Sequence, residues 1–184
     1  TTMILFLSIP FHGSINHFSK AAPYLPRVAV LVPAWNEAAV IGATIDRFVS
    51  LEYPRDRLRV YVVDDASTDA TPQVVQEWVA RHPGSVFHLR RAQGGEGKAH
   101  TLNHGLGIVL ADDWAEAVLI TDAGVIYRPD ALRKLARHLA DPEVGAVTAY
   151  VREGSRRKNY LTRFIAIEYV MAQVAARRAM PVSV

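Results

Sequence analysis

Three apolar segments of the sequence each run into a polar tip, and this pattern constrains the fold most. They are VAVLVPAWNE (residues 28–37), VYVVDDASTD (60–69) and AVLITDAG (117–124). Unbroken apolar runs are typical of strands that a parallel sheet buries on both faces, so we expect residues 117–121 to form a buried strand. Ligands of open α/β sheets bind beyond the carboxyl ends of such strands. If the three strands are neighbours, their tips face one crevice, and we expect the functional site there.

Apolar residues at helical spacing lie between these segments, over residues 40–49, 74–79 and 99–110. Weaker strands are expected at 85–89 and 144–150, and further helices after Pro129 and over 159–179. Thr71 is expected to cap the helix that Pro72 opens. Strands that alternate with helices of this length predict an α/β fold, a mostly parallel sheet flanked by helices on both faces.

The composition excludes several classes of protein. The chain has 184 residues, of which half are hydrophobic, and this is enough for one domain with a real core. It has no cysteine, which excludes a disulfide framework and a thiolate metal site and fits a reducing compartment. The net charge of +3 is too diffuse to indicate nucleic acid, but it suits an anionic small ligand or an anionic membrane surface.

The N-terminal residues 3–11 (MILFLSIPF) are apolar, but they fall short of the roughly 20 residues that a membrane-spanning helix needs. They also lack the basic leader and the cleavage site of a signal peptide. We interpret residues 1–26 as an arm and linker. Two readings of it remain open, the end of a transmembrane helix and a loosely packed arm.

Polar residues at the strand tips are the first candidates for chemistry. Asp64 and Asp65 follow a buried strand, where a carboxylate can accept hydrogen bonds from a base or a ribose. The alternative is a loop of helix-capping residues, and Asp69 and Thr71 fit it. Trp35 could stack on a base, although a core aromatic is the common reason for a tryptophan at such a position.

The glycine-rich loop QGGEGK (residues 93–98) is a second candidate. It is no P-loop, because Ala92 and Ala99 stand where that motif has glycine and Ser/Thr. It is no dinucleotide fingerprint, because His100 takes the last glycine position. It brings Lys98 to the start of a helix, which is a suitable place for a diphosphate. His100 and His104 have a zinc-chelating spacing but lack the HExxH glutamate, so solvated histidines are the better interpretation.

Taken together and in order, these motifs resemble the family 2 glycosyltransferases, the inverting GT-A enzymes that use nucleotide sugars. The likeness covers residues 28–179 and rests on VPAWNE, VVDDASTD, GEGKAHTLNHGL (95–106), ITDAG and R…NYLTRF…EY (157–169). The lysine-containing loop and the basic helix are most similar to the membrane-bound branch that makes polysaccharides. The resemblance implies a GT-A-like (Rossmann-like) α/β domain over residues 27–184, truncated before the acceptor half. It also implies a membrane-associated enzyme with this domain on the cytoplasmic side.

The resemblance also implies a donor site. It would bind the nucleotide sugar, with UDP expected, through Pro33, Ala34, Trp35, Glu37, Asp64, Asp65, Lys98, Asn103 and Asp122. The residues near Trp35 would line the base and ribose pocket, Asp65 with Asp64 nearby would contact the base, and Lys98, supported by Asn103, would face the diphosphate. Asp122 would be the first acid of the family's Asp-x-Asp motif, beside the ribose and a Mg²⁺ or Mn²⁺ ion.

Two departures from the family pattern limit this expectation. Gly124 stands where the motif has its second, metal-ligating Asp, so we predict weak metal binding and little transfer unless a water or another acid fills the gap. The catalytic base and the acceptor motif are expected beyond Val184. The predicted function is the donor half of sugar transfer to a saccharide or lipid-linked acceptor hydroxyl. The alternatives are a non-catalytic nucleotide-binding or scaffold module and, disfavoured because residues 34–38 offer no basic triphosphate loop, a nucleotidyltransferase.

Overall fold

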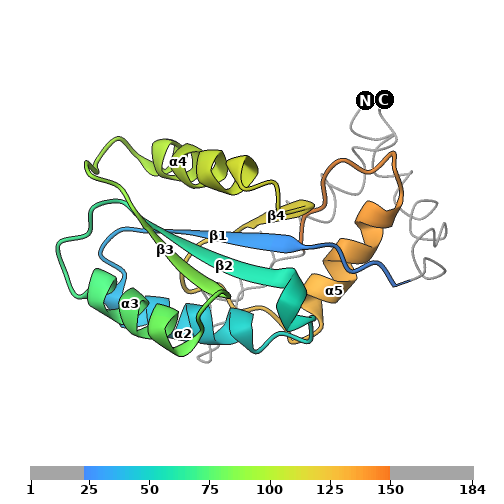
Figure 1. The fold of residues 1–184 in the computed structure, drawn as a ribbon, viewed down its shortest axis with the longest axis horizontal. Coiled ribbons are helices and arrows are strands. Elements are labelled where there is room, and N and C mark those ends of the chain that lie inside the picture. Colours follow the sequence, from blue (N-terminus) through green and yellow to red (C-terminus); the bar gives the residue numbers. More distant parts are fainter. Residues whose placement is uncertain (1–22, 150–184) are drawn as a thin grey trace, which may run out of the picture. The chain divides into compact units, whose positions relative to one another are not determined.

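The computed structural model describes residues 23–149, and a four-stranded parallel sheet forms their centre (Figure 1). The strands are β1 (Val28–Ala34), β2 (Leu58–Asp64), β3 (Val86–Arg90) and β4 (Ala117–Ile120). Their order is β3-β2-β1-β4. In the register, Val28 of β1 lies opposite Leu58 of β2 and Ala117 of β4. The three strands with polar tips are therefore neighbours, which meets the condition for a shared crevice at their ends.

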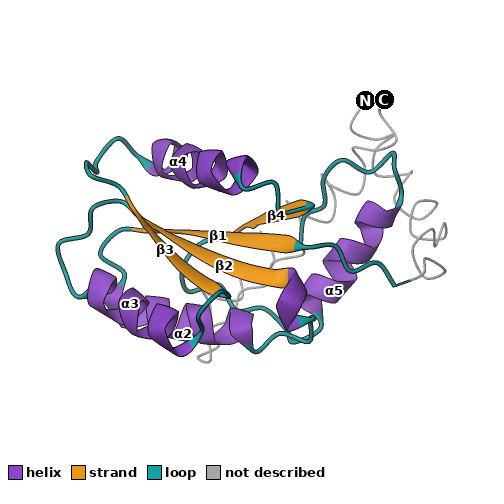
Figure 2. Ribbon diagram, viewed as in Figure 1, coloured by secondary structure: helices purple, strands orange, loops and turns teal. Residues whose placement is uncertain are grey.

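Helices cover both faces of this sheet (Figure 2). They are α2 (Ala38–Val49), α3 (Thr71–Arg81), α4 (Lys98–Ala111) and α5 (Ala131–Ala136), with short 3-10 turns at η1 (Arg55–Arg57) and η2 (Arg137–Ala140). Helices α2 and α3 lie on one face, and α4 lies on the other. The predicted α/β class, with a parallel sheet covered on both faces, is confirmed.

The central strand β1 supplies both halves of the core because its side chains alternate between the two faces. Val28, Val30 and Val32 pack in one cluster with Ile41 and other residues of α2. Ala29 and Leu31 point to the opposite face and pack in a second cluster with Val109 of α4. A strand buried on both sides leaves only its end free for a ligand.

Helix α4 lies unusually close to the sheet at Gly105. A Cβ atom at this position would come 2.5 Å from Cδ2 of Leu31 and 2.6 Å from Cγ2 of Val63. Glycine lets the helix pack against β1 and β2 at short range. The first turn of α4 begins at Lys98, so this packing also fixes where the lysine enters the crevice at the strand ends.

Three of the predicted elements differ in the structure. Strand β4 ends at Ile120, and its residues are half-buried rather than buried. The reason is that β4 lies at the edge of the sheet that the structure describes, where Ile120 is 48% exposed. Residues 144–149 form no strand, since no described strand pairs with them, and Tyr150 lies outside the described residues. Thr71 does not cap α3: Ala70 holds the N-cap position, and the Thr71 hydroxyl accepts a hydrogen bond from the Glu37 N–H instead.

Residues 23–137 form one compact unit that contains the sheet, and residues 138–149 belong to a second unit. The predicted arm (1–22 of its 26 residues) and the predicted helix 159–179 lie outside the described residues. Within residues 23–149, no helix is long and apolar enough to cross a membrane.

Candidate functional site

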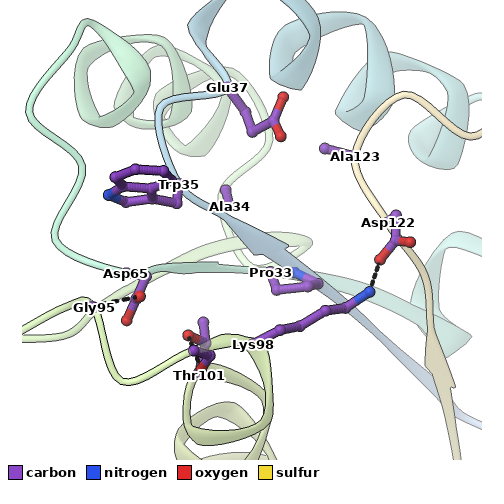
Figure 3. A pocket seen from close by; sticks show the side chains of 11 residues that line it. Pro33, Ala34, Trp35, Glu37, Asp65, Gly95, Lys98, Thr101, Asp122 and Ala123 are labelled. Atoms are coloured by element: carbon purple, nitrogen blue, oxygen red, sulfur yellow. Dashed lines mark hydrogen bonds and ion pairs between the residues drawn. The ribbon is translucent and has the colours of Figure 1, made fainter.

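A pocket of about 600 Å³ opens at the carboxyl ends of β1, β2 and β4 (Figure 3). Its lining consists of Pro33, Ala34, Trp35, Glu37, Asp65, Gly95, Gly97, Lys98, Thr101, Asp122 and Ala123. Because β2 and β4 flank β1 on opposite sides, Asp65 and Asp122 stand on opposite sides of the β1 tip. The crevice expected from the strand tips is therefore present.

The β1 tip presents an aromatic ring to this pocket. Trp35 follows the strand directly and is 63% exposed, so its indole is not a core residue. The next residue, Asn36, has a φ of 55°, a left-handed conformation that asparagine tolerates better than most residues. Its Oδ1 accepts a hydrogen bond from the Thr68 N–H at 2.9 Å, which holds the turn. The turn ends the strand and leaves the ring at the pocket wall.

Residues 67–71, in the later part of the loop after β2, hold the starts of the neighbouring helices and do not line the pocket. The Ser67 Oγ accepts the Asn36 N–H at 3.0 Å, and the Thr71 Oγ1 accepts the Glu37 N–H at 2.8 Å. The Asp69 carboxylate accepts the N–H of Ala38 and, from its other oxygen, the N–H of Thr71. The bonds to the Glu37 and Ala38 amides satisfy donors at the start of α2, and the bond to the Thr71 amide satisfies one at the start of α3, where the helix itself offers no partner. The capping interpretation of Asp69 is confirmed.

Asp65 lies on the pocket wall and is held on both carboxylate oxygens. Oδ1 pairs with the guanidinium of Arg91, and Oδ2 accepts the Gly95 N–H at 3.1 Å. Burial raises the pKa of Asp65, but the hydrogen bonds from Gly95 and Arg91 outweigh it, so the pKa lies below its usual value. Arg91 also pairs with Glu96. Asp65 is thus an ionised, pre-oriented acceptor at the edge of the pocket.

Asp64 points away from the pocket, although it is adjacent to Asp65 in sequence. Its side chain is fully buried, its Oδ1 accepts the Ser67 N–H at 2.8 Å, and its Oδ2 lies 3.2 Å from Nε2 of His88. Adjacent residues at the end of a strand face opposite sides of the sheet, and here only Asp65 faces the pocket.

The glycine-rich loop passes directly over the end of β2. A Cβ atom on Gly94 would lie 2.1 Å from the carbonyl oxygen of Asp65, so only glycine fits there. This close approach allows the next residue, Gly95, to donate its N–H to the Asp65 carboxylate. The loop then enters α4 at Lys98.

Lys98 extends across the pocket and forms an ion pair with Oδ1 of Asp122 (Figure 3). Both side chains are more than half exposed, at 55% and 60%. Gly124, two residues after Asp122, has a φ of +83°, and its N–H donates to the Thr44 Oγ1 at 2.9 Å. Position 124 therefore contributes no carboxylate. Within residues 23–149, no group of three or more His, Cys, Asp or Glu side chains is arranged to hold a metal ion.

Seven of the nine expected donor-site residues line this one pocket: Pro33, Ala34, Trp35, Glu37, Asp65, Lys98 and Asp122. The structure does not bring Asp64 and Asn103 into it; Asp64 is buried, and Asn103 is exposed on α4. Sequence reasoning missed Thr101 and Arg91. The signal for Arg91 was a basic residue directly after β3, the strand that pairs with β2 and so lies beside the Asp64–Asp65 tip. His100 and His104 are exposed, as solvated histidines would be.

Comparison with known proteins gives a consistent result. The family model described as glycosyltransferase like family 2 matches residues 26–183. The beta-monoglucosyldiacylglycerol synthase of Synechocystis sp. is 34% identical over 145 residues, which are 79% of this chain and 29% of that protein. The probable glycosyltransferase YdaM of Bacillus subtilis is 33% identical over 169 residues, which are 91% of this chain and 39% of that protein.

A solved structure extends the comparison to three dimensions. The mannosyltransferase PcManGT from Pyrobaculum calidifontis, in complex with GDP-Man and Mn²⁺, has a TM-score of 0.60 and 35% sequence identity to this chain. The match covers 78% of this chain and 44% of that one. The chain thus spans less than half the length of each of these three proteins.

Proposed function

Because the chain belongs to the glycosyltransferase-like family 2, we propose that it binds the nucleotide-diphosphate sugar from which the enzyme transfers a sugar. The observation that carries the proposal is the pocket at the ends of β1, β2 and β4. It combines an exposed indole, an ionised acceptor and a lysine within one cavity. The indole and the carboxylate suit a nucleobase, and the lysine suits a diphosphate.

Each part of the donor has a partner in this arrangement. The Trp35 ring offers a flat surface on which a base can stack, and Asp65 accepts hydrogen bonds from base N–H groups. Pro33, Ala34 and Glu37 complete that end of the pocket. At the other end, Asp122 accepts ribose hydroxyls, and Lys98 pairs with the diphosphate. Asp64 and Asn103 do not line the pocket, and we assign neither a contact with the donor.

We propose UDP as the nucleotide, because the motifs are most similar to those of polysaccharide synthases. The solved mannosyltransferase holds GDP-Man, so the two nucleotides must be compared directly. The acceptor is a hydroxyl of a saccharide or of a lipid-linked molecule. The name of the Synechocystis relative, a glucosyldiacylglycerol synthase, supports a lipid and with it a membrane surface, where this domain would lie on the cytoplasmic side.

Transfer with inversion needs a base that deprotonates the acceptor hydroxyl, which then attacks the anomeric carbon in line as the nucleoside diphosphate leaves. None of the residues that line the pocket is assigned that role, and we assign the base to a part of the enzyme outside the described residues. A divalent cation would meet Asp122 but no second carboxylate at position 124. These residues do not fit the cation site that an Asp-x-Asp motif would form.

A second candidate, a nucleotide-binding module without catalysis, is favoured by one observation, the glycine at position 124. Measurements of donor binding and of sugar transfer distinguish the two candidate functions. Isothermal titration of the chain with UDP-glucose, UDP-N-acetylglucosamine and GDP-mannose should give saturable binding, whereas free glucose should give none. Asp65→Ala should weaken donor binding about tenfold or more, because a charge-assisted hydrogen bond is lost.

The matched control is Asp46→Ala on the exposed side of α2, which should leave affinity unchanged. If none of the nucleotide sugars binds, or if Asp65→Ala binds as well as the parent, the proposed donor site is wrong. If a donor binds, release of free nucleotide is then measured on the chain extended past Val184, where the base is expected, with diacylglycerol vesicles or oligosaccharides as acceptors. Release supports transfer, and binding without release with every acceptor supports the non-catalytic module.

A further inference from the structure

The carboxylates around the pocket lack the second ligand that an Asp-x-Asp motif would offer a divalent cation. Mg²⁺ and Mn²⁺ take oxygen ligands, usually from one or two carboxylates together with substrate phosphates. The Asp65 carboxylate is already paired with the guanidinium of Arg91, whose positive charge opposes a second cation there, while its remaining lone pairs can still accept N–H donors. Asp122 pairs with Lys98, and Gly124 has no side chain. The mannosyltransferase structure contains Mn²⁺, a cation to which the residues around Asp122 in this chain offer no second carboxylate.

The Lys98 ammonium supplies a positive charge beside Asp122, where a divalent cation would otherwise supply it. Among the described residues that line the pocket, it alone has a cationic side chain, whereas Glu37, Asp65 and Asp122 are acidic. Its ammonium already lies against Asp122, the carboxylate that the resemblance assigns to the metal. A diphosphate needs a counter-charge here as it binds and as it leaves. The lysine is in position to supply it.

We propose that this chain binds its donor without a divalent cation and that the Lys98 ammonium takes the place of the metal at the diphosphate. The inference rests on the proposed donor-binding function and makes it more specific. When the donor enters, Lys98 exchanges its contact with Asp122 for the diphosphate oxygens. Asp122 is then free to accept the ribose hydroxyls.

The exposure of the ion pair makes this exchange feasible. The side chains of Lys98 and Asp122 are 55% and 60% exposed, and an ion pair in such a solvated setting contributes little to stability. Hydrogen bonds from an ammonium to phosphate oxygens are stronger than those between neutral groups. The diphosphate therefore competes well for the lysine, and no buried contact has to break.

Position 124 offers a direct way to test the idea. A Cβ atom at Gly124 would meet nothing within 4 Å, so a larger side chain has room. Its φ of +83° is unfavourable for most residues, but Asp and Asn tolerate the left-handed region better than other side chains. Gly124→Asp adds a carboxylate two residues from Asp122, and Gly124→Asn makes the same backbone demand without the charge.

The experiment is isothermal titration of the 184-residue chain with UDP-glucose and, in parallel, with GDP-mannose, each in EDTA and in Mn²⁺. We expect the parent chain to bind with affinities that agree within about twofold in the two buffers. Gly124→Asp should bind about tenfold more tightly in Mn²⁺ than in EDTA, and Gly124→Asn should show no such response. Lys98→Gln should lose about tenfold in both buffers, and Lys98→Arg should retain most of the affinity. Circular dichroism confirms that each variant is folded.

The possible outcomes separate this inference from the function on which it rests. Binding of the parent chain only in Mn²⁺ overturns the inference and leaves the donor site intact. Absence of binding in both buffers overturns the donor site, and the inference with it. A Lys98→Gln variant that binds as tightly as the parent in EDTA overturns the role of the lysine. A Gly124→Asp variant that does not respond to Mn²⁺ contradicts the link between position 124 and cation use.

Discussion

The Asp64 carboxylate lies 3.2 Å from Nε2 of His88, in the interior between β2 and β3 and away from the pocket that Asp65 lines. In the tautomer with its proton on Nε2, His88 donates to this carboxylate. The other ring nitrogen, Nδ1, lies 3.1 Å from the side-chain amide of Gln76 on α3. This chain of contacts joins β2, β3 and α3, and it makes Asp64 a residue of the fold.

Asp64→Ala should therefore destabilise the protein without changing the donor site directly. The substitution leaves the Ser67 N–H and His88 Nε2 without their acceptor in the interior. Loss of a buried, hydrogen-bonded charge costs about 3 kcal/mol. Urea denaturation of this variant and of Asp46→Ala, an exposed aspartate on α2, measures the difference. Equal free energies of unfolding for the two variants would contradict the structural role of Asp64.

The two adjacent aspartates also mark the limit of prediction from sequence. The alternation of apolar strands and helices was enough to predict the sheet, its covered faces and the crevice at the strand tips. The sequence places Asp64 and Asp65 on opposite sides of β2, but it does not say which side the ligand occupies. Both faces of the strand are covered by helices, so hydrophobicity gives no distinction. The answer depends on the pairing of β2 with β3, which brings His88 and Arg90 beside Asp64.

Strand β4 illustrates the same limit for burial. Its sequence is as apolar as that of β1, yet it is half-buried because the burial of a strand depends on its neighbours. The role of Arg91 could not be predicted from sequence for a similar reason. An arginine directly after a weak strand indicates a partner only once the strand pairing is known, because its contact with Asp65 depends on the two strand ends lying together.

Stability in acid should report the ionisation of Asp65. Its pKa is lower in the folded chain than the usual value of about 3.9, so its ionised form favours the native state. This contribution is complete well above pH 4 and is lost as the pH falls through the lower, folded-state pKa. Urea midpoints measured from pH 7 down to pH 3 should fall less steeply for Asp65→Asn than for the parent chain. The pH dependence of stability that remains in Asp65→Asn comes from other acids whose pKa values are also lowered, namely Asp69, Glu116 and Asp130. Parallel curves for the two proteins would contradict this assignment.

Two glycines on α4 form a matched pair for testing how closely the helix packs on the sheet. Gly105→Ala should destabilise the chain by about 1–3 kcal/mol, because its methyl group would overlap Leu31 and Val63 in the core. Gly107→Ala meets nothing within 4 Å and should stabilise the helix by up to about 1 kcal/mol. Thermal denaturation of both variants tests this contrast. If the melting temperature shifted in the same direction for both variants, helix propensity and not packing would dominate at Gly105.

Trp35 provides the most selective test of the pocket. The side chain is 63% exposed, so Trp35→Ala removes little buried area and should leave the free energy of unfolding within about 0.5 kcal/mol of the parent value. Stacking of a base on an aromatic ring contributes about 1–3 kcal/mol, and donor binding should therefore weaken by roughly 10- to 100-fold. Trp35→Phe keeps a ring at the β1 tip and should recover part of the loss, as measured by isothermal titration with the same nucleotide sugars. An alanine variant with undiminished affinity would mean that the base binds elsewhere, and the role given to Asp65 in binding it would then have to be abandoned.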